Sequence, residues 1–110
     1  MDVSRIFEIC EKKIFDVGAG VGRMVKFYID FVDKVLATDI FQNQIDFMKR
    51  RFFAYDCFSA ELIDILEANL SEYKGGFDTV ICINVLEHLS DDYLAVKKMS
   101  SLLEEGGKLF

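Results

Sequence analysis

The sequence contains no proline, only one histidine and three cysteines, and fewer cationic than anionic side chains. Cys10, Cys57 and Cys82 are too few and too widely spaced for a disulfide framework or a zinc site. Free thiols of this kind predict a reducing compartment, and we expect no metal centre. Without proline, every break between helices and strands has to come from glycine or from polar residues.

Long apolar runs are also missing. The longest runs, such as residues 80–83, are far shorter than the roughly 20 residues of a membrane-spanning helix. The first residues lack the basic-then-apolar order of a secretion signal, so we expect no membrane partner and a cytoplasmic location. The net charge of -6 offers no broad basic surface for phosphates, and a nucleic-acid partner is not expected. The basic run 49–51 is interpreted as the solvated face of a helix.

The 110 residues are 52% hydrophobic and 29% charged, which predicts a single domain over residues 1–110 with one packed core. Short apolar runs alternate with segments of helical period. Strands are expected at residues 13–17, 34–38, 62–66 and 78–83, with a fifth strand opening at 108–110. Helices are expected at residues 21–32, 41–52 and 89–103, the last of them ended by Gly106 and Gly107.

This alternation of strands and helices predicts an α/β fold, a Rossmann-like doubly wound parallel sheet with right-handed crossovers and helices on both faces. In such sheets, ligands bind beyond the carboxyl ends of the strands, where the strand order reverses. The residues that follow the expected strands are therefore candidates for binding. They are the glycine cluster 18–22, Asp39, Asn69 and Asn84.

The glycine cluster lies between the first strand and the first helix, in the run FDVGAGVGRM. Glycine lets a ligand approach the bare backbone, and free N–H groups at a helix start favour a negative ligand group. A merely tight turn is the alternative. The dinucleotide fingerprint needs glycine at its first, third and sixth positions, but the sixth residue counted from Gly18 is Arg23. The spacing therefore speaks against an NAD-binding enzyme.

From Asp16 the pattern is acidic-x-Gly-x-Gly-x-Gly, and here the chain resembles the class I S-adenosylmethionine-dependent methyltransferases. The likeness continues through ATDI, IDILEANL, FDTVICINVLEHLSDD and LLEEGGKLF, over roughly residues 12–110. It implies S-adenosylmethionine as cofactor and in-line transfer of its methyl group, with no covalent enzyme intermediate. The run NVLE lacks the Asn/Asp-Pro-Pro-aromatic tetrad of enzymes that methylate exocyclic or amide nitrogens. A small-molecule methyl acceptor is therefore expected, rather than a DNA base or a protein glutamine.

The resemblance also implies individual roles. Asp39 would accept both ribose hydroxyls, with an exposed capping aspartate as the alternative, and Ile40 would lie against the adenine face. Asn69 takes the place of the family's usual aspartate opposite the adenine amino group, beside the backbone N–H of Leu70. The main chain at Asn84 would approach the methionine end of the cofactor. The expected cofactor-binding set is Asp16, Gly18, Ala19, Gly20, Gly22, Asp39, Ile40, Asn69, Leu70 and Asn84.

Glu87 and His88 resemble the Glu-His pair of methyltransferases that act on small molecules, including quinone-biosynthesis types. An imidazole near the transferred methyl group could deprotonate an acceptor hydroxyl, which makes His88 the candidate catalytic residue. The alternative is a pair that only makes hydrogen bonds at a helix start. Asp91 and Asp92 are interpreted as acids of the first helical turn, which complement the helix dipole.

The family's complete catalytic domain has seven strands, whereas this sequence stops at Phe110, where the fifth begins. We therefore expect a sheet truncated after the start of strand five, with self-association or a missing C-terminal partner segment covering its edge. Two classes of function stay open. One is a methyltransferase or its cofactor-binding half; the other is a non-catalytic remnant or assembly module that retains the cofactor-binding fold. An NAD-binding enzyme, against which the glycine spacing speaks, is a further candidate.

Overall fold

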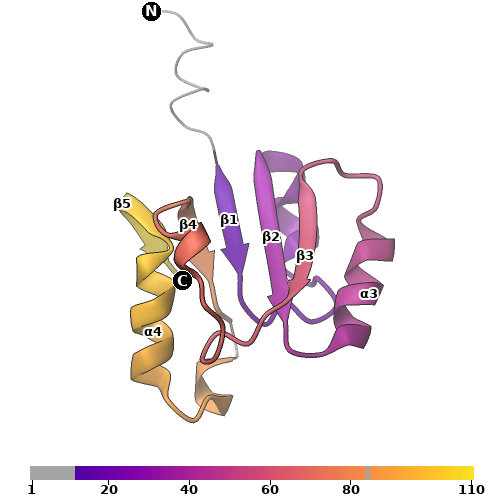
Figure 1. Ribbon diagram of the computed structural model, residues 1–110. Coiled ribbons are helices and arrows are strands. Elements are labelled where there is room, and N and C mark those ends of the chain that lie inside the picture. The colour runs from indigo at the N-terminus through magenta and orange to yellow at the C-terminus, as the bar shows by residue number, and fades with distance from the viewer. Residues whose placement is uncertain (1–11, 84) are drawn as a thin grey trace, which may run out of the picture.

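The computed structural model describes residues 12–83 and 85–110. Their strands form one five-stranded parallel sheet in the order β3-β2-β1-β4-β5, which confirms the expected doubly wound α/β fold (Figure 1). The strands are β1 (Lys13–Asp16), β2 (Lys34–Asp39), β3 (Phe58–Leu62), β4 (Phe77–Ile81) and β5 (Leu103–Leu109). The helical elements are α2 (Val25–Tyr28), η1 (Ile29–Phe31), α3 (Gln42–Arg51), η2 (Ser71–Tyr73), η3 (Leu86–His88) and α4 (Asp92–Ser101). Within these described residues, no helix is long and apolar enough to cross a membrane.

The strand order reverses at β1, which pairs with β2 on one side and with β4 on the other. Asp16, at the end of β1, lies opposite Ala37 of β2 and Ile81 of β4. The carboxyl ends of the three central strands therefore lie at one edge of the sheet. This edge is where a doubly wound sheet binds ligands.

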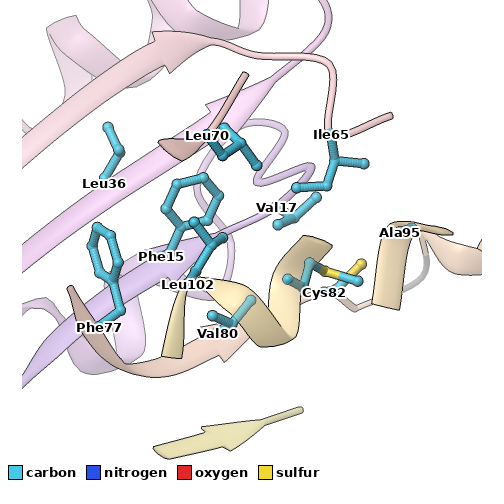
Figure 2. Packing of buried hydrophobic residues seen from close by; sticks show 11 residues of the cluster. Phe15, Val17, Leu36, Ile65, Leu70, Phe77, Val80, Cys82, Ala95 and Leu102 are labelled. Atoms are coloured by element: carbon cyan, nitrogen blue, oxygen red, sulfur yellow. The ribbon is translucent and has the colours of Figure 1, made fainter. Parts of the chain in front are cut away.

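Apolar side chains divide between the two faces of the sheet because successive strand residues point in opposite directions. One face is covered by α3 together with α2 and η1, and the other by α4 and the segment that joins β3 to β4 (Figure 1). Figure 2 shows the cluster on the α4 face, which is built around Phe15, Leu36 and Val80. The opposite face is filled by Val25, Ile29, Ala37, Ile45, Met48, Phe52 and Ala60.

The third strand is not where the apolar pattern predicted it. The expected strand 62–66 was wrong, because β3 spans Phe58–Leu62 and the following residues form a loop. β3 is an edge strand, and only Ala60 within it is buried, so it lacks the continuous apolar run of a central parallel strand. Ile65 is buried in the core from the loop, which explains why an apolar run continues beyond the strand.

Two helix boundaries also differ from the expected ones. Residues 21–24 form a turn, so the first helix is the single turn α2 followed by η1. The last helix ends at Ser101, and Gly106 and Gly107 lie inside β5 instead of ending that helix. β5 thus begins at Leu103, five residues before the expected opening at 108. Its register against β4 shifts between Phe77 and Thr79, and Gly106 has a φ of +81°, a conformation that glycine tolerates at a bulge.

Candidate functional site

A tight loop follows β1 at the carboxyl edge of the sheet. Gly18 and Gly20 have φ angles of +65° and +61°, in the left-handed region that glycine adopts without strain. A Cβ atom on Gly18 would lie 2.5 Å from Cγ2 of Val85, in the segment that follows β4. A Cβ atom on Gly20 would meet nothing within 4 Å. The loop is therefore tightly packed at Gly18 and faces open space at Gly20.

Asp39 joins the end of β2 to this loop. Its Oδ2 accepts a hydrogen bond from the Gly20 N–H at 2.9 Å, and its Oδ1 accepts one from the Phe41 N–H at 3.1 Å. The Ala19 N–H also donates to the Thr38 carbonyl at 2.8 Å. Asp39 is 7% exposed, so it is not the exposed capping residue of the alternative interpretation. A carboxylate has about four lone-pair sites, which leaves acceptor capacity beyond these two bonds.

Asp16 is a buried carboxylic acid at the end of β1, and 3% of its surface is exposed. Burial raises its pKa to about 6, although the hydrogen bond from Tyr28 opposes that shift. The Tyr28 hydroxyl donates to Asp16 Oδ2 at 2.8 Å, and burial followed by the nearby Asp16 charge raises the pKa of the tyrosine itself. The Thr38 hydroxyl fixes the backbone here by donating to the Asp16 carbonyl at 3.0 Å. The structure therefore holds this carboxyl group in one place.

Two adjoining cavities open at this edge. The Asp16 cavity has a volume of about 420 Å³, and the Asp39 cavity has a volume of about 280 Å³. Gly18, Gln44 and Val85 line both, so the cavities meet above the first glycine of the loop. The other residues of the Asp16 cavity are Asp16, Ala19, Gly20, Val21, Arg23, Met24 and Ile83. Those of the Asp39 cavity are Val17, Asp39, Ile40, Phe41, Ile63, Asp64, Ile65, His88 and Leu89.

Of the expected cofactor-binding residues that the structure describes, six line these two cavities and three do not. Gly22 is buried below the loop, where an added Cβ atom would clash with the Phe52 ring. The Asn69 Oδ1 accepts a hydrogen bond from the Ser71 N–H at 3.0 Å, and Asn69 lines neither cavity. Leu70 is buried in the core cluster. Asn84 lies outside the described residues.

Asp64 is the site residue that the sequence pattern missed. It lies just after β3, with Ile63 between, lines the Asp39 cavity and is exposed. Its Oδ1 accepts a hydrogen bond from the Leu66 N–H at 2.9 Å. The signal was present, because an acidic residue just beyond a strand is a candidate for binding. It was hidden because the expected strand 62–66 enclosed Asp64. Gln44, on the first turn of α3, was missed as well, since nothing in the helical pattern distinguishes it.

His88 lies in η3 and lines the Asp39 cavity, whereas Asp16 lines the adjoining cavity. Its Nε2 is 3.4 Å from Glu87 Oε1, and both side chains are mostly exposed. Asp91 caps α4, where its side chain accepts a hydrogen bond from the Leu94 N–H at 2.9 Å, and Asp92 lies in the first turn. The interpretation as a first-turn acid is confirmed for Asp92, whereas Asp91 is the N-cap residue just before the first turn.

The chemistry of the lining suits binding more than covalent catalysis. Both cavities present carboxylates, glycine backbone and apolar surface, and their described lining includes no serine, threonine, cysteine or lysine. The described residues also contain no cluster of His, Cys, Asp and Glu that could hold a metal ion. An elongated ligand with hydrogen-bond donors at both ends fits such a pair of cavities. The reactive group would then come from the ligand.

Comparison with known proteins identifies the family. The sequence profile of the methyltransferase domain matches residues 15–109. The chain is 29% identical over 108 residues to a ubiquinone biosynthesis O-methyltransferase of Xanthomonas euvesicatoria, covering 98% of this chain and 45% of that protein. It is 30% identical over 103 residues to a tRNA U34 carboxymethyltransferase of Campylobacter hominis, covering 90% of this chain and 35% of that protein.

A solved structure gives the same result. The trans-methyltransferase CalH, in complex with SAH, superposes with a TM-score of 0.81 at 28% identity, covering 91% of this chain and 31% of CalH. The chain thus spans less than half the length of the relatives that it matches. Because the profile covers most of the chain and the sheet has the expected order, the chain belongs to the class I S-adenosylmethionine-dependent methyltransferase family.

Proposed function

We propose that the chain binds S-adenosylmethionine across the two cavities and serves methyl transfer to a small-molecule acceptor. The observation that carries this proposal is the pair of adjoining cavities, which share Gly18 and have Asp16 and Asp39 at separate ends. Their combined size suits one extended ligand, since ligand pockets commonly measure about 300–1,000 Å³. The adenosine part would occupy the Asp39 cavity and the methionine part the Asp16 cavity.

The adenosine end rests on side chains that follow β2 and β3. The spare lone pairs of Asp39 would accept the ribose hydroxyls, and Ile40 would lie against the adenine ring, since it is exposed and lines this cavity. Asp64 is better placed than Asn69 to accept a hydrogen bond from the adenine amino group, because only Asp64 lines the cavity. We therefore assign to Asp64 the role first expected of Asn69.

The methionine end rests on Asp16 and the glycine loop. Above its pKa of about 6, the Asp16 carboxylate is charged and would attract the ammonium group of the cofactor. Gly20 leaves open space in which a ligand can lie against the backbone. The approach of the main chain at Asn84 stays a prediction. When bound, the cofactor supplies an electrophilic methyl group, while these residues orient it and exclude water.

The catalytic role of His88 also stays a prediction. His88 shares a cavity with Asp39 and Asp64, whereas the proposed methionine end is the neighbouring cavity. That position favours a wall of the adenosine site over a general base at the transferred methyl group. Turnover would then depend mainly on the orientation of two bound reactants, which can supply a large share of a rate enhancement.

A small-molecule acceptor is favoured over RNA. The net charge of -6 does not favour binding to phosphates, and the Xanthomonas relative carries the name of an O-methyltransferase of ubiquinone biosynthesis. The Campylobacter relative is named for tRNA, so tRNA belongs among the compounds tested. The assembly-module alternative retains cofactor binding at most and predicts no turnover with any acceptor.

Calorimetric titration of the chain with S-adenosylmethionine, S-adenosylhomocysteine and NAD tests the proposal. We expect micromolar affinity for the first two and none for NAD. A methyl-transfer assay with labelled cofactor then compares hydroxylated aromatic compounds with bulk tRNA. Binding with turnover on an aromatic compound supports the proposal, and turnover on tRNA alone contradicts the acceptor class. A folded chain that binds neither adenosyl compound would contradict the proposal and favour the assembly module.

A further inference from the structure

A lysine of α4 contacts the loop that follows β3, although the two segments are far apart in sequence. The Nζ atom of Lys98 donates hydrogen bonds to the Leu66 carbonyl at 3.1 Å and to the Ala68 carbonyl at 2.6 Å. The Lys98 side chain is half-buried, while its neighbour Lys97 is exposed. Charge-assisted hydrogen bonds are shorter and stronger than neutral ones, so two from one ammonium group hold both carbonyls firmly.

The two carbonyls belong to a turn that Asp64 closes from its other end. Asp64 Oδ1 accepts from the Leu66 N–H at 2.9 Å, and the Asp64 carbonyl accepts from the Ala68 N–H at 2.9 Å. Ile65 lies between them and is 3% exposed, in the same core cluster as Ala95 of α4. Residues 64–68 therefore form a small unit that Ile65 anchors in the core cluster and that Lys98 links to α4.

One face of this unit lines the Asp39 cavity through Asp64 and Ile65. Asp64 itself is exposed, and one of its carboxylate oxygens is engaged by the turn. The direction of the other oxygen is therefore set by the orientation of the turn. Lys98 does not line the cavity, so its influence on a ligand has to pass through this unit.

We propose that Lys98 is a positioning residue that directs the Asp64 carboxylate towards the adenine amino group, and so sets the preference of the site for adenine. This inference rests on the proposed function, because it assumes that the adenosine end occupies the Asp39 cavity. Lys98 touches neither cofactor nor acceptor in this scheme. Its loss would loosen the adenine wall and leave the ribose contact at Asp39 in place.

The test compares S-adenosylhomocysteine with S-inosylhomocysteine, in which a carbonyl replaces the adenine amino group. The wild-type chain is expected to bind the adenine compound about tenfold more tightly, since one good hydrogen bond to a charged group has about that effect. Lys98→Met keeps the alkyl stem and removes the ammonium group, and it should reduce this ratio to within about twofold of unity. Lys98→Arg, which keeps the charge, should restore most of it. Lys97→Met is the matched control and should leave the ratio unchanged.

The ratio separates positioning from stability, because a purely structural lysine lowers the melting temperature and leaves the ratio of the two affinities intact. Lys98→Met with a wild-type ratio would therefore overturn the inference. If Lys98→Met does not fold, Lys98→Gln takes its place, and its ratio decides in the same way. In an Asp64→Asn background, removal of Lys98 should change the ratio no further. A wild-type chain that binds S-adenosylhomocysteine without preferring adenine overturns the role of Lys98 alone, whereas no binding at all overturns the proposed function first.

Discussion

The two cavities of the site are walled in different ways. Around the Asp16 cavity, the wall is the glycine loop, which main-chain hydrogen bonds and positive φ angles fix against the ends of β1 and β2. The outer wall of the Asp39 cavity comes from η3 and from the loop after β3, and the Lys98 side chain holds that loop in place. The first wall is fixed by main-chain geometry together with the Asp39 carboxylate, and the second depends on side chains farther along the sequence. Substitutions should therefore act through stability at the first and through ligand preference at the second.

The largest expected effect is on the backbone-built wall, at Gly22. In Gly22→Ala, the new Cβ atom would clash with the ring of Phe52, a buried residue of the α3 face, at a φ of +84°. Left-handed backbone and overpacking together should lower the free energy of unfolding by about 3 kcal/mol. Urea denaturation measures the change.

Gly20→Ala is the matched control for Gly22→Ala. Gly20 also has a left-handed φ, of +61°, but an added Cβ atom there would meet nothing within 4 Å. Only the backbone term applies, so the loss of stability should be about 1 kcal/mol. Equal losses in the two variants would show that packing against Phe52 does not restrict the loop.

The next effect compares two carboxylates of the Asp39 cavity: Asp39, which also accepts a hydrogen bond from the glycine loop, and Asp64 of the loop after β3. Asp39→Ala removes acceptors from the N–H groups of Gly20 and Phe41 and also removes the proposed ribose contact. Affinity for S-adenosylhomocysteine should fall at least about 30-fold, and stability should fall by about 2 kcal/mol. Asp64→Ala should weaken binding about tenfold, with little loss of stability, because Asp64 is exposed. Calorimetry and urea denaturation of both variants measure these changes, and an unchanged affinity in Asp39→Ala would contradict the placement of the ribose.

The same difference explains what the sequence could predict. Gly18, Gly20 and Asp39 were expected at the site because they follow strands, and Asp16 was expected from the resemblance of its motif to that of the family. The central parallel strands could be predicted because strands buried on both faces read as continuous apolar runs. β3 was misplaced because an edge strand with one buried residue has little pattern, and this error put the expected adenine contact at Asn69 instead of Asp64, where we propose it. The hydrogen bonds of Lys98 join residues about 30 positions apart, and no local pattern specifies them.

A third prediction concerns pH and the buried Asp16. Its pKa of about 6 in the folded chain lies above the ordinary value of 3.8, so the folded state binds the proton more tightly than the unfolded state does. The stability from this group is fully present below pH 3.8 and is lost as the pH rises through 6. In Asp16→Asn the group stays neutral, so its free energy of unfolding relative to the wild type should rise by on the order of 2 kcal/mol between pH 4 and pH 7.5.

Urea denaturation of the wild type and Asp16→Asn at the two pH values measures this change. Asp33→Asn, at an exposed position, is the control and should show no such trend. The stabilised Asp16→Asn chain should also bind S-adenosylhomocysteine more weakly, because it has lost the charge that attracts the ammonium group. A relative stability that is constant between the two pH values would mean that Asp16 titrates normally.

The smallest effect is expected at His88, on the side-chain-built wall. The His88 side chain is 75% exposed and its partner Glu87 is 64% exposed, and such surface pairs contribute little. His88→Ala should therefore change the affinity for S-adenosylhomocysteine by less than about threefold. The two hypotheses for His88 separate in turnover: a general base contributes about 10²–10⁴-fold, whereas a wall residue leaves kcat within about tenfold. We expect the second result, with Glu87→Gln as the control for the loss of the pair. A drop beyond 10²-fold at unchanged affinity would instead support His88 as the general base. The acceptor would then have to approach from the Asp39 cavity, and the two cavities would exchange roles.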